Sequence, residues 1–336
     1  MKNVLVAIAL TLLPLSGAAQ SKADITRDAV TAHILPRFAD LASNSQTLAN
    51  ASIADCTSDA LRTQYTDAFD AWIAVSHLRF GPTEVDNRAF ALAFWPDSRG
   101  ATPKALTRLI LDEDTIAQSA ATYADMSISA RGFYALEFLI YDASISATGS
   151  PAYRCQLIQT VTADIARMTT AMNDEWQETY AEQLLKPSVS GVYRSDDEAT
   201  QELFKALLTG LQFTSETRMG RPLGTFDRPR PTRAEAWRSA RSTQHVAVSL
   251  TTLHDLALRL ADGNAPLQIK LSDSFNLAHD QLLALEDPIF AGVALPSSRF
   301  KIEIVQQSIE AIRTISRDEL GPHLGVAAGF NALDGD

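Results

Sequence analysis

One stretch in the first half of the chain, RGFYALEFLIYD at residues 131–142, carries two phenols and a carboxylate on the same helical face. Tyr134, Glu137 and Tyr141 are three and four residues apart, so a helix turning about 100° per residue places them within about 60° of one another. Phenols and a carboxylate together suit a half-buried surface on which each polar tip has a hydrogen-bond partner. We expect these side chains to form the floor of a binding site, with Arg131 neutralising Glu137.

The residues of this face leave two interpretations open. The first is a structural hydrogen-bond cluster without a ligand, because buried polar networks often serve only to specify packing. The second is a site for a hard cation such as ferric iron, held by phenolate and carboxylate oxygens with Glu137 as a metal ligand. Residues of a single helix cannot complete a coordination shell, so the second interpretation needs ligands from elsewhere in the chain.

The usual signatures of several catalytic sites are absent from the sequence. It contains no HExxH zinc motif, no G-x-S-x-G turn, no phosphate-binding loop and no CxxC pair. The six histidines include no two at the three- or four-residue spacing of neighbours on a helix. We single out His77, because it lies beside Arg79 just before the FGP segment that is expected to end a helix.

The amino terminus predicts export. Residues 1–19 combine one lysine, a short apolar run and small residues near Ala19, which is the pattern of a signal peptide cleaved after Ala19. No later segment reaches the roughly 18 uncharged apolar residues of a membrane span, so we expect a periplasmic mature chain without one. The chain has 40 acidic against 29 basic residues, which argues against a nucleic-acid partner.

The two cysteines of the chain, Cys56 and Cys155, both follow the predicted cleavage point. In an oxidising compartment two cysteines usually pair. Cys56 precedes one predicted helix and Cys155 lies in the first turn of another, so a parallel placement of the two helix starts would bring them together. We therefore predict one disulfide, and the alternative is a pair of buried free thiols.

Apolar residues recur at helical spacing in nearly every long segment, and alternating strand patterns are almost absent. Pro36 is expected to kink the first helix, and Ser150 with Pro151 is expected to begin a long one. We predict an all-α fold of antiparallel helical bundles. The predicted helices cover residues 24–50, 57–80, 151–185, 196–219, 232–262, 267–286 and 298–319.

The domain organisation follows from two irregular segments. Residues 186–195, KPSVSGVYRS, have no helical period and are rich in turn-forming residues. We therefore predict a first bundle at 20–190 and a second at 191–336, packed around a shared cleft. Residues 81–102 are a second long irregular segment, and loops of that length are often functional.

Four segments in the expected order resemble the imelysin-like family, in which imelysin was named as an insulin-cleaving membrane protease. The family signature G-x-H-x-x-E corresponds here to Gly132, Tyr134 and Glu137. The other similar segments are AWIAVSHLRFGP with the following FWPD, EAWRSARS at 235–242, and the carboxyl-terminal LGVAAGFNALDGD. The resemblance implies an exported bacterial protein of two helical-bundle repeats, linked to iron uptake, with a site near the interface between the repeats.

The sequence departs from the family at the decisive position, where Tyr134 replaces the histidine. Some members carry a peptidase label, which rests on that histidine and the glutamate as metal ligands. A neutral imidazole is a good zinc ligand, whereas a phenol with a pKa near ~10 binds zinc poorly. Zinc is therefore disfavoured as a cofactor, iron stays a candidate, and any metal would include Glu137 among its ligands.

These observations favour a non-catalytic periplasmic binding protein connected with iron uptake. One alternative is a metallopeptidase that uses Glu137 with ligands from elsewhere, and another is a helical scaffold that docks a membrane partner. The partners to consider are components of iron uptake or a membrane protein.

We expect the similar segments of both halves to converge on the cleft. The alternative for EAWRSARS is a helix with a solvated basic face. The residues expected to join Tyr134 and Glu137 there are Trp72, His77, Arg79 and Asp97 from the first half, and Ser239 and Ser242 from the second.

Overall fold

The computed structural model describes residues 21–326, and within that span it contains helices and turns but no β-strand. Thr225 and Arg228 form an isolated antiparallel bridge. The predicted all-α fold is thereby confirmed. The predicted signal peptide and the last ten residues of the carboxyl-terminal LGVAAGFNALDGD segment lie outside the described residues. None of the described helices is both long enough and apolar enough to cross a membrane.

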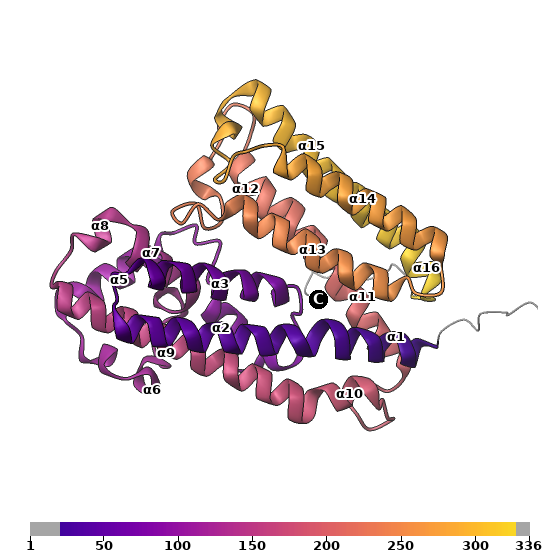
Figure 1. Cartoon of the computed structure of the whole chain (residues 1–336), viewed down its shortest axis with the longest axis horizontal. Helices are drawn as coiled ribbons and strands as arrows, with labels where there is room; N and C mark the ends of the chain where they lie inside the picture. Colours follow the sequence, from indigo (N-terminus) through magenta and orange to yellow (C-terminus); the bar gives the residue numbers. More distant parts are fainter. Residues whose placement is uncertain (1–20, 327–336) are drawn as a thin grey trace, which may run out of the picture.

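The first half of the chain forms one layer of long helices, drawn in indigo and magenta in the lower part of Figure 1. The helix α2 (Leu35–Ala54) packs against both α3 (Asp59–Val75) and α9 (Pro151–Glu175). The other helices of this layer are α4 (Arg88–Leu92), α5 (Ala101–Asp112), α6 (Ala120–Tyr123), α7 (Gly132–Tyr141), α8 (Ala143–Ser146) and α10 (Ala181–Leu185).

The helix α3 illustrates how the sequence determines this layer. The Ser58 side chain accepts a hydrogen bond from the Leu61 N–H and so caps the first turn. Tyr65, Phe69 and Trp72 follow Leu61 at steps of three and four residues, and all four side chains are buried. Burying each such side chain contributes roughly 1.5–3 kcal/mol, so this face fixes the helix in the core.

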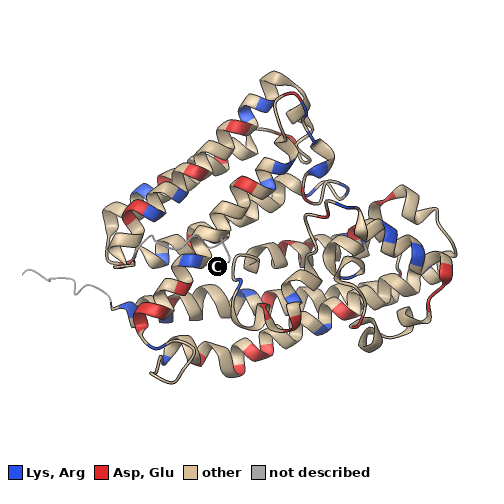
Figure 2. Cartoon of the chain, turned by 180° about the vertical axis from the view of Figure 1, so that it is seen from behind, with Lys and Arg blue, Asp and Glu red and all other residues tan. Residues whose placement is uncertain are grey.

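The second half forms another layer, drawn in orange and yellow in the upper part of Figure 1. The helix α13 (Ser242–Leu260) packs against α14 (Ala265–Leu283), and α14 packs against α15 (Pro296–Ile315). This layer also contains α11 (Asp196–Gln212), α12 (Gly220–Leu223) and α16 (Gly321–His323). Lys and Arg residues are interspersed with Asp and Glu residues along helices of both layers (Figure 2).

The amino-terminal helix α1 (Lys22–Asp28) packs on α11, which belongs to the other half of the chain. The Thr26 and Thr200 hydroxyls are 3.2 Å apart, and Lys22 pairs with Asp197 at 2.5 Å. The segment 186–195 between the halves consists of turns and bends until α11 begins, as expected. The division into bundles at 20–190 and 191–336 stays a prediction.

Pro36 perturbs the first helix as expected. Residues 29–34 form a π-helical turn between α1 and α2, and Pro36 occupies the first turn of α2. Proline has no N–H to donate and is tolerated at the start of a helix, so a break in regular α-helix just before it is the natural arrangement. Similar π-helical turns extend α9, α11 and α15 at residues 176–180, 213–219 and 316–320.

One helix prediction needs correction, and one helix was not predicted. The helix predicted over 232–262 begins only at Ser242, because residues 234–241 form turns in which Ala236 and Ala240 have φ of 48° and 56°. The helix α5 was not predicted, although its Leu106, Leu109 and Ile110 are buried at helical spacing.

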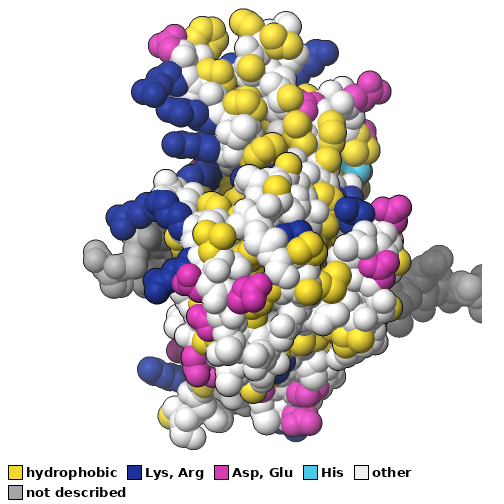
Figure 3. Space-filling view, turned by 90° about the vertical axis from the view of Figure 1, so that its left-hand side faces the viewer, with side chains coloured by type: hydrophobic (Ala, Val, Ile, Leu, Met, Phe, Trp, Pro, Cys, Tyr) yellow, Lys and Arg dark blue, Asp and Glu magenta, His cyan; other side chains and the backbone are white. Residues whose placement is uncertain are grey.

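Seen from the end of the molecule, Lys and Arg side chains gather along the left edge of the face shown in Figure 3.

The predicted disulfide between Cys56 and Cys155 is present, with the Cα atoms 5.5 Å apart. It joins the turn after α2 to the first part of α9, as the positions of the two helix starts required.

Reduction of this disulfide should lower the free energy of unfolding by about 4–5 kcal/mol, because it releases a cross-link that constrains a long loop of the unfolded chain. The two cysteines are 99 residues apart in the sequence. The measurement is urea denaturation with and without reductant, and the Cys56→Ser, Cys155→Ser double variant should not respond to reductant. Two alkylatable thiols in the protein purified without reductant would contradict the prediction.

Candidate functional site

The G-x-Y-x-x-E segment lies at the start of α7, and its glycine is required by close packing. Gly132 has φ of +74°, and a Cβ atom there would lie 2.2 Å from the Leu92 carbonyl oxygen. Any side chain would therefore force the end of α4 away from α7. The preceding Arg131 does not neutralise Glu137 as predicted, because its guanidinium pairs with the buried Asp164 at 2.8 Å and 3.0 Å.

Tyr134 reaches across to the second half of the chain, where its hydroxyl donates a hydrogen bond to Glu235. Glu235 is 2% exposed. Its other carboxylate oxygen accepts a hydrogen bond from Arg218 Nε at 2.7 Å and lies 3.2 Å from His245 Nδ1. We call Tyr134, Arg218, Glu235 and His245 the carboxylate cluster.

The charge states in the carboxylate cluster follow from burial and from these contacts. Burial would raise the pKa of Glu235, but the Arg218 charge and the hydrogen bonds from His245 and Tyr134 outweigh it and lower the pKa to about 2. Burial, together with the Glu235 charge, holds the pKa of Tyr134 well above its usual value of 10. Tyr134 is therefore a neutral phenol that donates, and Glu235 is an ionised acceptor.

Glu137 lies one turn further along α7 and contacts the same segment of the second half. Its Oε1 accepts hydrogen bonds from the Ser239 N–H at 3.0 Å and from the Ser239 hydroxyl at 2.9 Å. Burial raises the pKa of Glu137, and the Ser239 hydrogen bonds oppose that effect. Tyr141, the last residue of the predicted row, is half-buried with its ring centroid 5.6 Å from that of Tyr65.

Segment 234–241, which contains most of EAWRSARS, is not a helix with a solvated basic face. Arg238 pairs with Asp142 at 2.8 Å and its guanidinium lies 3.8 Å from the centre of the Phe138 ring. Arg241 pairs with Asp70. Both arginines are thus partly buried links to the first layer, and residues 234–241 form turns that follow the surface of α7.

A cavity of about 390 Å³ lies between the two halves, beside the carboxylate cluster. Of the residues expected at a cleft, Trp72, His77, Arg79 and Tyr134 line it. Ser239 and Ser242 lie behind its wall, where Ser239 binds Glu137 and the Ser242 hydroxyl donates to the Glu235 carbonyl at 2.6 Å.

Asp97 has a different position from the one expected. Its carboxylate accepts hydrogen bonds from the N–H groups of Arg99, Ala101 and Thr102 and so caps α5. The cavity is instead reached by its neighbours Trp95 and Pro96.

A histidine pair connects the cavity wall to the second layer. His33 Nε2 and His77 Nε2 are 3.0 Å apart, and His33 Nδ1 lies 2.8 Å from the Asp255 carboxylate. Burial lowers the pKa of His33 to about 4 and holds the pKa of His77 well below its usual value, so both rings are neutral near pH 7. Asp255 accepts a hydrogen bond from the His33 Nδ1–H, and His33 Nε2 then accepts one from the His77 Nε2–H. This leaves His77 Nδ1 as an acceptor.

The side chains of this region, as arranged, do not fit a resident metal ion. Tyr134 is a neutral donor, the Glu137 Oε1 is hydrogen-bonded to Ser239, and Glu235 is engaged by Tyr134, Arg218 and His245. Over residues 21–326 there is no group of three or more His, Cys, Asp or Glu side chains placed to hold a metal ion. We therefore derive no chemical step through a metal, and Glu137 as a metal ligand stays a prediction.

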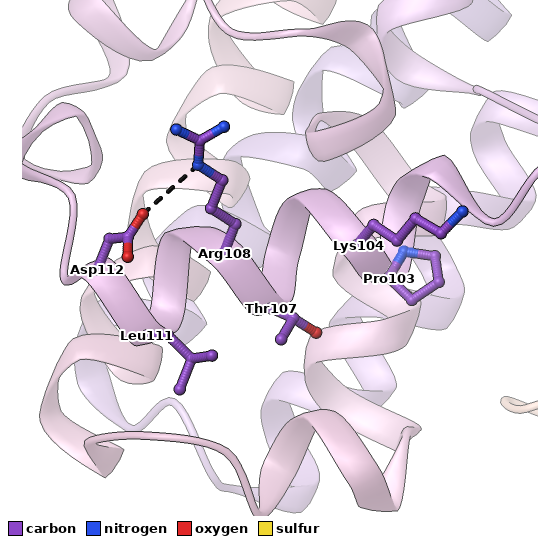
Figure 4. A pocket seen from close by; sticks show the side chains of 6 residues that line it. All are labelled: Pro103, Lys104, Thr107, Arg108, Leu111 and Asp112. Carbon is purple, nitrogen blue, oxygen red and sulfur yellow. Dashed lines mark ion pairs between the residues drawn. The ribbon is translucent and has the colours of Figure 1, made fainter.

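A second hollow lies on the outer face of α5 (Figure 4). All six of its lining side chains come from that one helix, and Arg108 and Asp112 form an exposed ion pair 3.5 Å apart. Leu111 is 64% exposed. This is the solvent face of a helix, so we place the functional site at the cavity between the halves.

Sequence reasoning missed several residues of the site, and Glu235 is the most important of them. Glu235 stands inside the similar segment EAWRSARS, but of that segment only Ser239 and Ser242 are expected at the cleft from the sequence. The sequence does not indicate a site role for His245, because no second histidine lies at helical spacing from it. The missed residues are Trp95, Arg218, Glu235, His245 and Ser249, which meet only through the tertiary structure.

The fold and site define an all-helical protein of two layers that enclose a cavity beside a buried carboxylate cluster. The family described as Imelysin matches residues 34–315, and the chain belongs to that family. The chain is 23% identical over 287 residues to iron-regulated protein A of Synechococcus elongatus, which covers 78% of this chain and 74% of that protein.

Two solved structures share the fold. An imelysin-like protein from Psychrobacter arcticum superposes with a TM-score of 0.78 at 20% identity, covering 93% of this chain and 99% of the other. A protein assigned as an iron-regulated protein A precursor from Parabacteroides distasonis gives a TM-score of 0.74 at 13% identity, covering 91% and 97%.

Glu235→Gln should lower the free energy of unfolding by about 3–5 kcal/mol, because it leaves the Arg218 charge buried without its partner. The matched control is Glu182→Gln, which breaks the exposed pair with Lys186 and should change stability by about 0.5 kcal/mol or less. Both values come from urea denaturation at pH 7. Similar effects of the two substitutions would show that the carboxylate cluster does not stabilise the fold.

The stability of the protein should fall as the pH is lowered from about 6.5 to 4. A histidine whose folded pKa is depressed resists protonation in the folded state, whereas the unfolded chain takes up the proton below its pKa of about 6.5. With a folded pKa of about 4, His33 alone should remove about 3 kcal/mol across this window. Denaturation curves at several pH values measure the slope.

His33→Gln should flatten this pH dependence, whereas His323→Gln at an exposed histidine should retain it. Asp255, whose pKa is depressed in spite of burial by hydrogen bonds from His33 and Arg259, contributes stability that is lost only at lower pH. An unchanged slope in His33→Gln would refute the assignment to the histidine pair.

Proposed function

We propose that this protein is an exported, periplasmic, non-catalytic binding protein linked to iron uptake. The cavity between the two halves is its binding site. The observation that carries the proposal is that Trp72, His77 and Tyr134 of the first half line one cavity with Arg218 and Glu235 of the second. A cavity of about 390 Å³ is within the usual range for small-molecule sites.

The side chains in and beside the cavity argue against catalysis. A general base or metal ligand needs a free lone pair toward the substrate, and both oxygens of Glu235 are already engaged by Tyr134, Arg218 and His245. Glu137 is buried against Ser239 and does not line the cavity. The residue of the family signature that does line it, Tyr134, is a neutral phenol.

The link to iron rests on the family and on the names of its relatives. The relative from Synechococcus elongatus is named iron-regulated protein A. The predicted signal peptide supports a periplasmic location. On this proposal, partners among the iron-uptake components would receive or deliver what the cavity holds.

A second candidate, a helical scaffold that docks a membrane partner, is favoured by one observation. The large apolar side chains Phe226, Leu295 and Phe300 are 60% to 71% exposed in the second layer. Arg299 connects the segments that carry them, since its guanidinium lies 5.7 Å from the Phe226 ring and donates to the Leu223 carbonyl at 2.6 Å. Exposed apolar groups of this kind are typical of protein contact surfaces.

The decisive experiment compares growth in iron-limited medium of a strain lacking this protein with the same strain carrying it. We expect slower growth without the protein, recovery with the wild type, and recovery with the Phe226→Ser, Phe300→Ser variant. Loss of recovery in that variant alone would favour the scaffold. Equal growth of all strains would remove the link to iron.

Purified protein should bind ferric and zinc ions no better than its Tyr134→Phe and Glu137→Gln variants, and it should not cleave peptides. Binding that is lost in Glu137→Gln would establish the metal site. Cleavage that a chelator abolishes and that Glu137→Gln lacks would establish the metallopeptidase. Tyr134→His tests whether restoring the family histidine alone creates zinc affinity.

A further inference from the structure

Two hydroxyl groups at the cavity wall have no hydrogen-bond partner among residues 21–326. Ser249 is 3% exposed, and its Oγ and the Thr209 Oγ1 are both buried and unpaired. Both residues line the cavity. An unpaired buried hydroxyl is unfavourable in the empty protein, so a ligand that supplies its partner gains affinity. Ser249 therefore points to a ligand with a hydrogen-bonding group at that wall.

The walls of the cavity favour a flat apolar body. Trp95 lies 6.1 Å from Tyr134, with the two rings only 22° from parallel, and Phe213 stands edge-on to Trp95 at 6.2 Å. Trp72 and Leu253 contribute further apolar surface from the two layers. Aromatic walls of this kind contact a planar ring efficiently by stacking and edge contacts.

The charge around the cavity favours an anion. Arg79 pairs with Glu84, and Arg218 pairs with Glu235, so these two guanidinium groups are neutralised. Arg221 lies 5.8 Å from the Trp95 ring, and its Nε is buried without a hydrogen-bond partner in the described part of the chain. No carboxylate of residues 21–326 forms an ion pair with Arg221, which leaves one positive charge behind the aromatic wall.

We propose that the cavity binds a small aromatic acid that carries one negative charge and a ring hydroxyl. The ring lies against the aromatic wall, the hydroxyl pairs with Ser249, and the carboxylate is drawn to the uncompensated charge of Arg221 behind that wall. The inference rests on the proposed function, because it names the ligand class of the same cavity. Organic cations are disfavoured, because the charge of Arg221 is not compensated by a carboxylate of residues 21–326, whereas Arg79 and Arg218 are paired with Glu84 and Glu235.

Four probes of similar size separate these contributions: salicylate, benzoate, benzyl alcohol and benzylamine. Titration calorimetry, with quenching of tryptophan fluorescence as a second readout, should give affinities that decrease in that order. Salicylate should bind roughly 5- to 10-fold more tightly than benzoate, which is the usual effect of one hydrogen bond. Tighter binding of benzyl alcohol or benzylamine than of salicylate would overturn the inference.

Ser249→Ala is the informative variant, and Ser45→Ala is its matched control. Ser45 is also fully buried with an unpaired hydroxyl, but it lies on α2 and does not line the cavity. Both substitutions remove an unpaired polar group, so neither should lower the melting temperature. Ser249→Ala alone should weaken salicylate binding, by roughly 5- to 10-fold, while leaving benzoate binding unchanged.

Arg221→Gln tests the charge. It should weaken salicylate and benzoate by a similar factor and leave benzyl alcohol unchanged. If benzyl alcohol binds but neither Arg221→Gln nor Ser249→Ala affects the acids, the ligand class is wrong while a binding cavity is retained. If no probe binds at millimolar concentration, the inference is overturned, and the growth experiment still judges the proposed function independently.

Discussion

Glu235 imposes the constraint on which the arrangement of the two halves depends. An ionised carboxylate that is almost fully buried must have its acceptors satisfied, or the fold loses several kcal/mol. Tyr134, Arg218 and His245 meet that need from three separate segments, so each segment has one position that completes the set. The cavity lies beside this cluster because Tyr134 and Arg218 serve as both partners of Glu235 and walls.

Most of the fold could be predicted from the sequence because the signals that define a helix, its caps and its apolar spacing, lie within a few residues of one another. The caps at Ser58 and Ser150 and the apolar spacing of α3 and α9 depend on neighbours within a few residues. Segment 234–241 could not be predicted in this way. Its composition favours a helix, but contacts of Glu235 and Ser239 with α7 hold Ala236 and Ala240 in the left-handed region instead.

The candidate site was predictable to the extent that one helix face carries it. The row Tyr134, Glu137 and Tyr141 was visible, but which partner each side chain has depends on residues about 100 positions away. Arg131 shows the limit most clearly. Its spacing favoured Glu137, whereas the structure brings Asp164 of α9 to it, and a pairing across helices leaves no trace in local periodicity.

The packing of α1 on α11 has a consequence for how the chain reaches its final form. The helix α1, which is the first that the structure describes, has partners that lie 174 and 175 residues later, at Thr200 and Asp197. Its apolar face, which includes Ile25, therefore lacks its packing partner α11 until more than half of the protein has been synthesised. A chaperone that holds the amino-terminal region extended would suit this delay, and a fragment ending before α11 would leave that face open to aggregation.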